Sequence, residues 1–327
     1  MQDKLISTIK QFAEQRIVIL GDAIADKFVH GSISRVSREA PVFILRHQHT
    51  ETLPGGAANC AMNLVALGAR VSLIAVTGND ESGSELRAKL EAAGVNINGV
   101  IISDRVQTTT KVRILAGQSH SSKQQVIRVD YEGAPLDDEE IRNAILNRLE
   151  QAFNGANAIV ISDYNYGVVD APGAELIRKA VDVPVLVDSR FRLSEFTGFT
   201  AATPNEEEVE NLAGASISST GDLESAARTL KQSLGHHALL VTRGSQGMTL
   251  LEADAAPVHI SAVGAQHAVD VTGAGDTVIA TFALGLACGA SFVDAARLAN
   301  YAGGLVVMKR GTATVSAAEL EQAIRQD

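Results

Sequence analysis

Short apolar runs alternate with longer helical patterns along most of the chain, and this alternation is the strongest constraint on its fold. Runs typical of buried strands occupy residues 16–20, 71–76, 158–161, 183–187 and 239–242. Helical spacing of apolar residues lies between them, at 57–67, 137–153, 171–180 and 222–234. Strands that alternate with helices in this way form a parallel sheet with helices on both faces. We therefore expect an α/β fold with a mostly parallel central sheet.

Two segments interrupt the alternation, residues 28–53 and 108–131. In the second, polar and apolar residues alternate at 111–115 and 125–129, which is the pattern of a strand exposed on one face. We expect the two segments to form a small β-strand lid over the edge of the main sheet. No repeat or low-complexity linker divides the 327 residues, so the sequence predicts a single domain, 1–327, that carries this lid.

Composition and charge exclude several classes of partner and site. The net charge is -10, with a pI near 5.3, so we expect no nucleic-acid partner. Cys60 and Cys288 form no C-x-x-C pair, which argues against a zinc or disulfide framework. The longest apolar stretch, 278–290, is shorter than the ~20 residues of a membrane span, and no apolar secretory region precedes the first strand. We expect a cytoplasmic protein without membrane contact.

The most informative motif is Asp-Val-Thr-Gly-Ala-Gly-Asp-Thr at residues 270–277, followed by an apolar helical pattern. A helix that begins at a glycine-rich turn leaves backbone N–H groups unpaired, and these groups favour an anion. Gly273 and Gly275 would let a phosphate approach the backbone closely. Asp276 would then take a proton from an attacking hydroxyl, while the N–H groups of Gly273, Ala274 and Gly275 hold phosphoryl charge. Taken alone, the motif also fits a plain helix start with a favourable acidic residue.

Two better-known nucleotide motifs are absent. No Gly-Lys-Ser/Thr sequence occurs, so there is no Walker A loop. Position 278 is Val, and the motif comes late in the chain, so Gly273 and Gly275 do not open a dinucleotide fingerprint. A nicotinamide dehydrogenase is therefore disfavoured.

Residues 270–276 resemble a signature of the ribokinase (PfkB) family of carbohydrate kinases. The family's other signature is a Gly-Gly near the N-terminus, and Pro-Gly-Gly-Ala-Ala-Asn at 54–59 is similar to it. The two motifs occur in the family's order and span nearly the whole chain. The resemblance implies a ribokinase-like fold with Asp276 as the base, ATP and Mg²⁺ as cofactors, and in many members a monovalent cation such as K⁺.

For the sugar, the resemblance implies contacts from Asp26, Asp22 and Asn59. Both aspartates follow the first strand at its carboxyl end, where open α/β sheets bind ligands, although Asp is also a common turn residue. Gly55 and Gly56 would let the backbone pass close to the sugar.

Cationic side chains of the lid are candidates for binding a phosphate on the substrate. Lys111 and Arg113 lie two apart on a predicted strand and so share a face, and Arg128 lies on the neighbouring strand. Arginine can bind a phosphate in a bidentate manner. The solvated face of a sheet would show the same alternation of charges, so both interpretations stay open.

For the nucleotide, the resemblance implies two further groups of residues. It places Mg²⁺ at Asn205 and Glu208, in a segment that also fits a capped helix start. Asp270, with Thr272 and Gly311, occupies a place matching the family's metal site for a monovalent cation. Contacts to ATP are implied for Thr242, Arg243, Gly244, Gly247, Asn300 and Gly303.

Several stretches resemble one branch of the family, the D-glycero-β-D-manno-heptose-7-phosphate kinases of lipopolysaccharide precursor synthesis. They are residues 54–63, 110–113, 124–130, 162–164 and 241–243. The branch phosphorylates the anomeric hydroxyl to give the 1,7-bisphosphate on the route to ADP-heptose. It is fused to a nucleotidyltransferase in some organisms. Because this chain ends at Asp327, we expect the kinase alone.

One departure from this branch and two alternative functions stay open. The branch has Asp-Pro-Lys where this chain has Asp188-Ser-Arg190, so the role of Arg190 is undecided. The alternatives are a kinase for another sugar, sugar phosphate or nucleoside, and a non-catalytic sugar sensor on the same fold. Lid strands exposed on a monomer would leave unpaired edges, so we also expect a homodimer through the lid.

Overall fold

The computed structural model describes residues 2–117, 123–253, 255–264 and 268–327, and it contains two sheets. The larger sheet has nine strands in the order β13-β12-β11-β10-β9-β8-β1-β4-β5. Every neighbouring pair from β11 to β5 is parallel, whereas β12 and β13 at one edge are antiparallel. The predicted α/β fold with a mostly parallel sheet is confirmed.

The elements of the main body follow the predicted alternation closely. Its strands are β1 Arg16–Gly21, β4 Arg70–Gly78, β5 Asn96–Ser103, β8 Ala158–Asp163, β9 Val185–Ser189, β10 Ala201–Ala202, β11 Ala238–Thr242, β12 Met248–Glu252 and β13 Val258–Ile260. Its helices are α1 Gln2–Ile9, α2 Ala57–Ala66, α3 Glu81–Ala93, α4 Glu139–Ala152, α5 Ala171–Ala180, α6 Glu206–Ala213, α7 Thr220–Leu234, α8 Ala274–Ala287, α9 Phe292–Val306 and α10 Ala317–Gln326.

The apolar runs of the sequence are continuous because the sheet is buried on both faces. Along β1, Ile17 and Ile19 enter one hydrophobic core, which α2, α8 and α9 cover. Val18 and Leu20 point the other way, into a second core beneath α4, α5 and α7. Successive side chains of a strand alternate between faces, so burial of both faces requires every position to be apolar.

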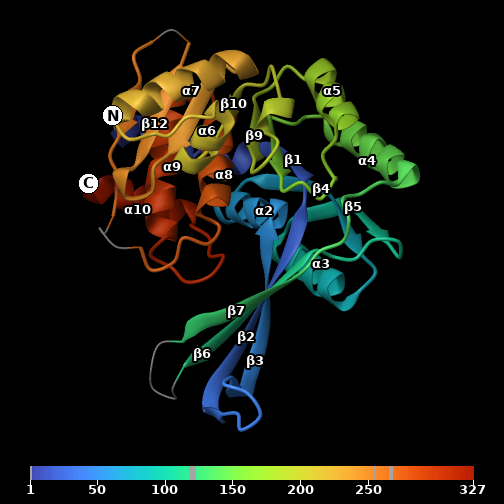
Figure 1. The fold of residues 1–327 in the computed structure, drawn as a ribbon. Helices are drawn as coiled ribbons and strands as arrows, with labels where there is room; N and C mark the ends of the chain where they lie inside the picture. Colours follow the sequence, from blue (N-terminus) through green and yellow to red (C-terminus); the bar gives the residue numbers. More distant parts are fainter. Residues whose placement is uncertain (1, 118–122, 254, 265–267) are drawn as a thin grey trace.

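The smaller sheet is the lid, which extends away from the main body (Figure 1). Its strands are β2 Ala23–Val36, β3 Phe43–Gly56, β6 Thr110–Gly117 and β7 Gln124–Tyr131, in the order β3-β2-β6-β7. β2 pairs with β3 antiparallel and with β6 parallel, and β6 pairs with β7 antiparallel. The first lid segment is longer than the predicted 28–53, because the buried ends of β2 and β3 continue into the main body. Residues 118–122 of the predicted second segment lie outside the described residues.

Among the described residues, no helix combines the length and the apolar character that crossing a membrane requires.

Candidate active site

The Asp276 carboxylate lies in the first turn of α8 and is held by two donors. Asn59 Nδ2 donates to its Oδ2 atom (2.8 Å), and the Tyr164 hydroxyl donates to its Oδ1 atom (3.0 Å). Burial raises the pKa of Asp276 to about 7, although both hydrogen bonds lower it. A carboxylate that titrates near neutral pH is well matched to accept a proton from a substrate.

The start of α8 offers backbone donors for an anion. Gly273 is the N-cap residue, with φ of 75°, and the first helical bond runs from the Thr277 N–H to the Gly273 carbonyl (3.2 Å). The Ala274 N–H bonds the Val271 carbonyl (3.2 Å). The N–H groups of Gly275 and Asp276 have no hydrogen-bond partner in the part of the chain that the structure describes. Of the predicted donors, the Gly275 N–H is available beside the carboxylate, whereas the Ala274 N–H is already bonded. The Asp276 N–H is available as well.

A cavity of about 590 Å³ lies beside this helix start, lined by Asp188, Asn205, Glu208, Thr242 and Gly275 among others. Asn205 and Glu208 form the capping box of α6, in which each side chain accepts the other's backbone N–H (2.8 and 2.9 Å). Burial raises the pKa of Glu208, and burial followed by repulsion from Glu208 raises that of Asp188. Carboxylates in such surroundings favour a cation.

The donor set of this cavity fits Mg²⁺ held largely by other ligands. Carboxylate and amide oxygens are the donors that Mg²⁺ prefers. No group of three or more acidic, histidine or cysteine side chains with metal-binding geometry exists among the described residues. Asn205 and Glu208 would therefore hold the ion together with nucleotide phosphates and water.

Asp270, the third predicted metal residue, does not line this cavity. Its carboxylate accepts the N–H groups of Thr272 (3.0 Å) and Gly311 (2.9 Å). Burial would raise the pKa of Asp270, but these bonds outweigh it and lower the pKa. The structure thus brings Asp270, Thr272 and Gly311 together as predicted, because the Asp270 carboxylate connects its own loop to that of Gly311. A cation at this place stays a prediction.

The predicted ATP-contacting residues are divided between the cavity and local structure. Thr242 lines the cavity, whereas the Arg243 guanidinium bonds Glu206 (2.8 Å) and Gln246 (2.8 Å). Gly244 and Gly247 have φ of 53° and 86° and shape the turn between β11 and β12.

Asn300 and Gly303 lie on α9, near the segment that follows β13. Asn300 Nδ2 donates to the Ser261 carbonyl (2.8 Å). At Gly303, a Cβ atom would lie 3.2 Å from the Val278 side chain, so this position allows α9 to pack against α8. Contacts of Asn300 and Gly303 with ATP stay a prediction.

The strand register places the predicted cations on one face of the lid. Lys111 pairs with Asp130 and Arg113 with Arg128 across β6 and β7, so all four side chains share that face. Arg113 forms an ion pair with Asp26, and Arg128 binds Asp130 through two hydrogen bonds (2.8 and 2.9 Å).

This face borders a second cavity, of about 410 Å³, which Lys111, Arg128 and Arg190 line together with Tyr164 and Tyr166. Lys111 Nζ lies 6.0 Å and 5.8 Å from the two tyrosine ring centroids. Burial lowers the pKa of Lys111, although nearby carboxylates oppose this. Asp130 and Glu132 also line the cavity, so its three cationic side chains outnumber two carboxylates and leave positive charge for an anionic group.

The two cavities have a common wall. Tyr164, Arg190 and Phe191 line both, and the Tyr164 hydroxyl reaches Asp276. The Asp276 carboxylate is thus hydrogen-bonded to a residue of the wall that the cavity with Lys111, Arg128 and Arg190 shares with the cavity lined by acidic and amide oxygens. This arrangement suits transfer of a phosphoryl group from a metal-bound nucleotide to a phosphorylated acceptor.

The glycine pair makes room for the aspartates after β1. A Cβ atom on Gly55 would lie 2.5 Å from Asp26 Oδ2, and one on Gly56 would lie 2.6 Å from the Asp22 carbonyl oxygen. Burial raises the pKa of Asp26, although its partner Arg113 lowers it. The structure therefore brings Asp26, Gly55 and Gly56 together, as predicted.

Asp22 is placed differently from Asp26. Its carboxylate accepts the backbone N–H groups of Tyr164 (2.7 Å), Tyr166 (3.2 Å) and Val168 (3.2 Å). Burial raises the pKa of Asp22 to about 6, although these bonds lower it. Asp22 thus anchors the loop after β8, and its contact with a sugar stays a prediction.

Sequence reasoning assigned no role to Tyr164, Tyr166 or Asp188. All three follow β8 or lie at the end of β9, at the same carboxyl edge of the sheet as Asp22. Ligands of open α/β sheets bind at this edge, so position alone could have made them candidates.

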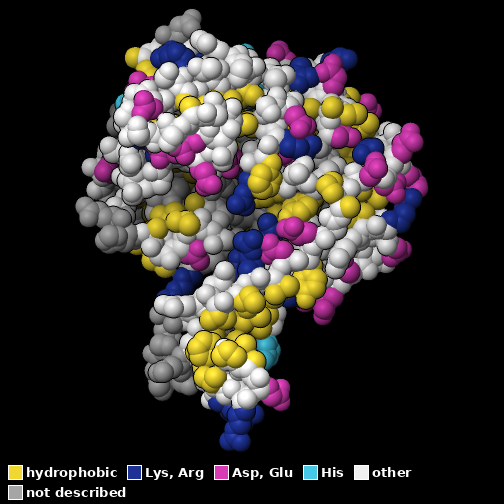
Figure 2. Space-filling view, viewed as in Figure 1, with side chains coloured by type: hydrophobic (Ala, Val, Ile, Leu, Met, Phe, Trp, Pro, Cys, Tyr) yellow, Lys and Arg dark blue, Asp and Glu magenta, His cyan; other side chains and the backbone are white. Residues whose placement is uncertain are grey.

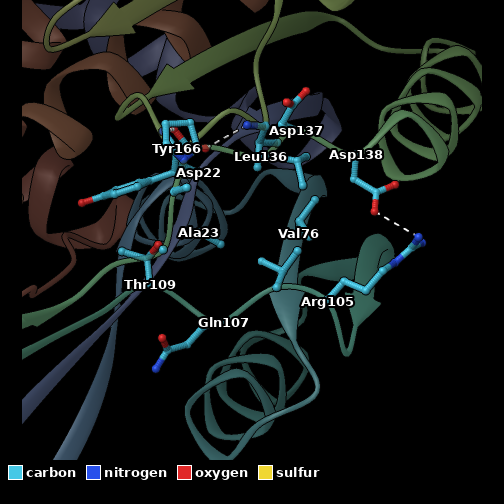
Figure 3. A pocket seen from close by; sticks show the side chains of 15 residues that line it. Asp22, Ala23, Val76, Arg105, Gln107, Thr109, Leu136, Asp137, Asp138 and Tyr166 are labelled. Carbon is cyan, nitrogen blue, oxygen red and sulfur yellow. Dashed lines mark hydrogen bonds and ion pairs between the residues drawn. The ribbon is translucent and has the colours of Figure 1, made fainter.

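A third cavity, of about 300 Å³, lies at the base of the lid (Figure 3). Asp22, Val76 and Leu136 line it, together with residues 105–107, which lead toward β6. Arg105 pairs with Asp138 across it (3.1 Å), and the Leu136 N–H donates to the Tyr166 carbonyl (2.9 Å). The ion pair thus connects the segment before β6 to the segment after β7.

Residues 15–319 match the model of the family described as pfkB family carbohydrate kinase. The chain belongs to this family. The predicted membership is confirmed, and with it the class of ATP-dependent carbohydrate kinases, which use Mg²⁺.

Curated relatives are about 40% identical to the chain over the aligned residues. The bifunctional protein HldE of Alcanivorax borkumensis is 41% identical over 321 residues, which cover 98% of this chain and 65% of that protein. HldE of Coxiella burnetii (strain Dugway 5J108-111) is 40% identical over 329 residues, which cover 100% of this chain and 66% of that protein. The chain thus spans about two thirds of the length of these relatives.

Solved structures agree in fold. Phosphofructokinase-2 from Escherichia coli, in complex with substrates and products, superposes with a TM-score of 0.79 at 20% identity, covering 95% of this chain and 99% of that one. Arabidopsis thaliana ribokinase, complexed with ribose and ATP, gives a TM-score of 0.73 at 22% identity, covering 95% and 98%. The predicted ribokinase-like fold is confirmed.

Proposed function

We propose that the chain transfers the γ-phosphate of ATP to the anomeric hydroxyl of D-glycero-β-D-manno-heptose 7-phosphate. The product would be the 1,7-bisphosphate, a precursor of ADP-heptose for lipopolysaccharide. The observation that carries this proposal is the cavity with Lys111, Arg128 and Arg190, which borders the wall that contacts Asp276. A phosphorylated sugar needs such cations, and the 41% identity to an HldE protein supports the choice of sugar.

In this proposal Asp276 accepts the proton of the anomeric hydroxyl, whose oxygen forms the new bond to phosphorus. The bond from that phosphorus to the bridging oxygen of ADP breaks. The Gly275 and Asp276 N–H groups stabilise charge on the transferred group. Asn205 and Glu208 would hold Mg²⁺, which would neutralise phosphate charge. The lid excludes water, and this limits hydrolysis of ATP.

Two further expectations belong to this proposal. A monovalent cation would bind beside the loop that Asp270 connects to Gly311. One structural neighbour, Escherichia coli phosphofructokinase-2, was solved in complex with potassium. The reaction itself would take place in the cytoplasm, where ATP and sugar phosphates are available.

The test is release of ADP from Mg-ATP with a panel of acceptors: D-glycero-D-manno-heptose 7-phosphate, ribose, fructose, fructose 6-phosphate and adenosine. We expect strong activity with the heptose phosphate alone. Activity mainly with another acceptor would overturn the proposed substrate and keep the kinase class. No ADP release with any acceptor would favour a sugar sensor on the same fold.

A further inference from the structure

The hydroxyl of Tyr164 contacts the carboxylate oxygen of Asp276 that Asn59 does not contact. The Tyr164 bond to Oδ1 is 3.0 Å long and the Asn59 bond to Oδ2 is 2.8 Å long, so each carboxylate oxygen of Asp276 accepts one fixed donor. A carboxylate oxygen can accept two hydrogen bonds. Both donors therefore orient the carboxylate and leave capacity for a substrate hydroxyl.

The Asn59 side is fixed by further buried groups. Asn63 Nδ2 lies 3.2 Å from Asn59 Oδ1, and the Thr277 hydroxyl lies 2.9 Å from Asn63 Oδ1. Asn59, Asn63 and Thr277 are each at most 1% exposed. Buried polar groups that bond one another in series hold a single arrangement, because a change in one leaves another unpaired.

The Tyr164 side depends on Asp22. The Asp22 carboxylate accepts the backbone N–H of Tyr164 at 2.7 Å, the shortest of its three bonds to the loop after β8. The Tyr164 ring also packs on Gly56, where a Cβ atom would approach Cε2 to 3.2 Å. Asp22 and Gly56 thus fix the backbone and the ring from which the hydroxyl reaches Asp276.

We propose that Tyr164 is a positioning residue for Asp276, and that Asp22 acts on the reaction through the Tyr164 loop and not by contact with the sugar. The inference rests on the proposed role of Asp276 as the base. It explains why the Asp22 carboxylate, at the carboxyl end of β1, accepts hydrogen bonds from backbone N–H groups.

Several other titratable groups face the two carboxylates and must be kept unchanged in a test. Around Asp276 they are Asp26 of β2, Cys60 of α2 and Asp188 of β9. Around Asp22 they are Asp163, Tyr166 and Arg192. The variants below alter none of these groups except Tyr166, in one control.

The experiment is the pH dependence of kcat/KM between pH 5.5 and 9.5, with the acceptor that the panel identifies. The wild-type protein should lose activity below about pH 7, as Asp276 becomes protonated. The acid limb of this profile is the fall in kcat/KM toward low pH. In Tyr164→Phe the ionised carboxylate loses a donor, so the pH of the acid limb should rise by about one unit. The loss of activity should be about tenfold at pH 6 and small at pH 9.

Two matched changes control this result. Tyr166→Phe removes a hydroxyl from the same loop that donates to Glu132, so its acid limb should stay in place. Incorporation of 3-fluorotyrosine at position 164 keeps the ring and makes the hydroxyl a stronger donor, so its limb should move down. This second change also serves if Tyr164→Phe fails to fold.

Asp22→Asn separates the two possible roles of Asp22. If Asp22 is a positioning residue, Asp22→Asn should raise the pH of the acid limb. The KM for the sugar should stay within about twofold of wild type. Combined with Tyr164→Phe, it should add little, because both changes act on one chain of contacts.

Three outcomes would overturn the inference. The acid limb of Tyr164→Phe could stay at the wild-type pH, or its kcat/KM could be lowered by the same factor at all pH values. The third is a large rise in the KM for the sugar in Asp22→Asn. Failure of the proposed base is seen separately, since Asp276→Asn would then retain turnover.

Discussion

Burial raises the pKa of Asp276, and for the same reason it lowers the stability of the folded protein at neutral pH. Its folded-state pKa of about 7 lies above the ordinary 3.8, so the unfolded chain loses this proton at lower pH than the folded one. The free energy of unfolding therefore falls as pH rises from about 4 to 7, and it stays lower above pH 7. The shift corresponds to at most about 4 kcal/mol.

Asp276→Asn should greatly reduce turnover and stabilise the protein. We expect kcat to fall about a thousandfold, within the range for loss of a general base, with the Kd for Mg-ATP within about twofold. The gain in melting temperature should be small at pH 4.5 and largest above pH 7, since only the wild type carries the ionised group. Thermal unfolding at several pH values checks this, and a gain that is equal at all pH values would contradict it.

Gly273 and Gly275 should respond oppositely to alanine. Gly273 has φ of 75°, and a Cβ atom there would lie 2.4 Å from Asn59 Nδ2, so Gly273→Ala should lower stability by about 1–3 kcal/mol. At Gly275 the nearest atom would be 3.9 Å away, and the position is helical, so alanine should leave stability unchanged or higher.

Both variants should lose activity, because a Cβ atom intrudes where the phosphate approaches the backbone. Denaturant unfolding of the two proteins side by side separates the effects. A Gly275→Ala protein destabilised as much as Gly273→Ala would contradict the expected difference in space at the two positions.

Residues that follow a motif could be predicted from sequence, and residues that depend on a distant contact could not. Asp276 lies in a motif whose local spacing indicates its chemistry. For Asn59 the family resemblance implied a contact with the sugar, whereas its side chain donates to Asp276 in the structure; the sugar contact stays a prediction. Tyr164 is 112 positions from Asp276, and only the order of β8 and β1 in the sheet brings its loop to α8. Asp22 shows the opposite case, since its place after β1 was predicted but its partners are backbone groups of another loop.

At the scale of elements, the two faces of the lid differ in character. Lys111, Arg113 and Arg128 share the face toward the main body, whereas their neighbours Val112, Ile127 and Val129 share the other. This follows from the alternation of side chains along paired strands. The sequence could therefore predict which lid residues act together.

Lys111→Met should weaken binding of a phosphorylated sugar selectively. Loss of one charge-assisted bond to phosphate corresponds to about a 10- to 100-fold rise in KM. The KM for Mg-ATP should change little. Lys27→Met is a matched control. Lys27 lies on β2, on the face of the lid sheet opposite to that of Lys111, and pairs with Glu85 (3.5 Å). Equal effects of the two changes on the KM for the sugar phosphate would count against a phosphate site at Lys111.

Elements buried on both sides of the sheet were the easiest to predict, and short or exposed ones were missed. β1, β8 and β11 have uninterrupted apolar runs because two cores cover them. β10 has only two residues, and its strand character depends on pairing with β9 and β11. The antiparallel edge of β12 and β13 carries no signal that distinguishes it from a further parallel strand.

At the scale of the whole molecule, the lid carries an unusual amount of exposed apolar surface. Hydrophobic side chains gather on it in the view of Figure 2. Phe43, Ile127 and Tyr131 are 59%, 53% and 50% exposed, and every residue of β7 is exposed. Apolar patches and open strand edges of this kind are usually covered by another chain.

We expect a second copy of the chain to cover the outer face of the lid. Size-exclusion chromatography with light scattering should give about 69 kDa, twice the 34.3 kDa of one chain. Ile127→Lys with Val129→Lys should give the monomer mass, because buried lysines would lack partners. Ile102→Lys is a control, since Ile102 is 53% exposed on β5 of the main body and should leave the dimer intact. A wild-type protein of 34 kDa at all concentrations would reject the dimer.

The dimer should also affect the reaction, because the two faces of β6 and β7 belong to the same strands. Packing on the outer face would hold the strands whose inner face presents Lys111 and Arg128 to the sugar cavity. The monomeric double variant should therefore show a higher KM for the sugar phosphate and an unchanged KM for ATP, whose predicted contacts lie on the main body. Steady-state kinetics with each substrate varied in turn checks this. A parallel rise of both KM values would instead indicate that the substitutions disturb the whole active site.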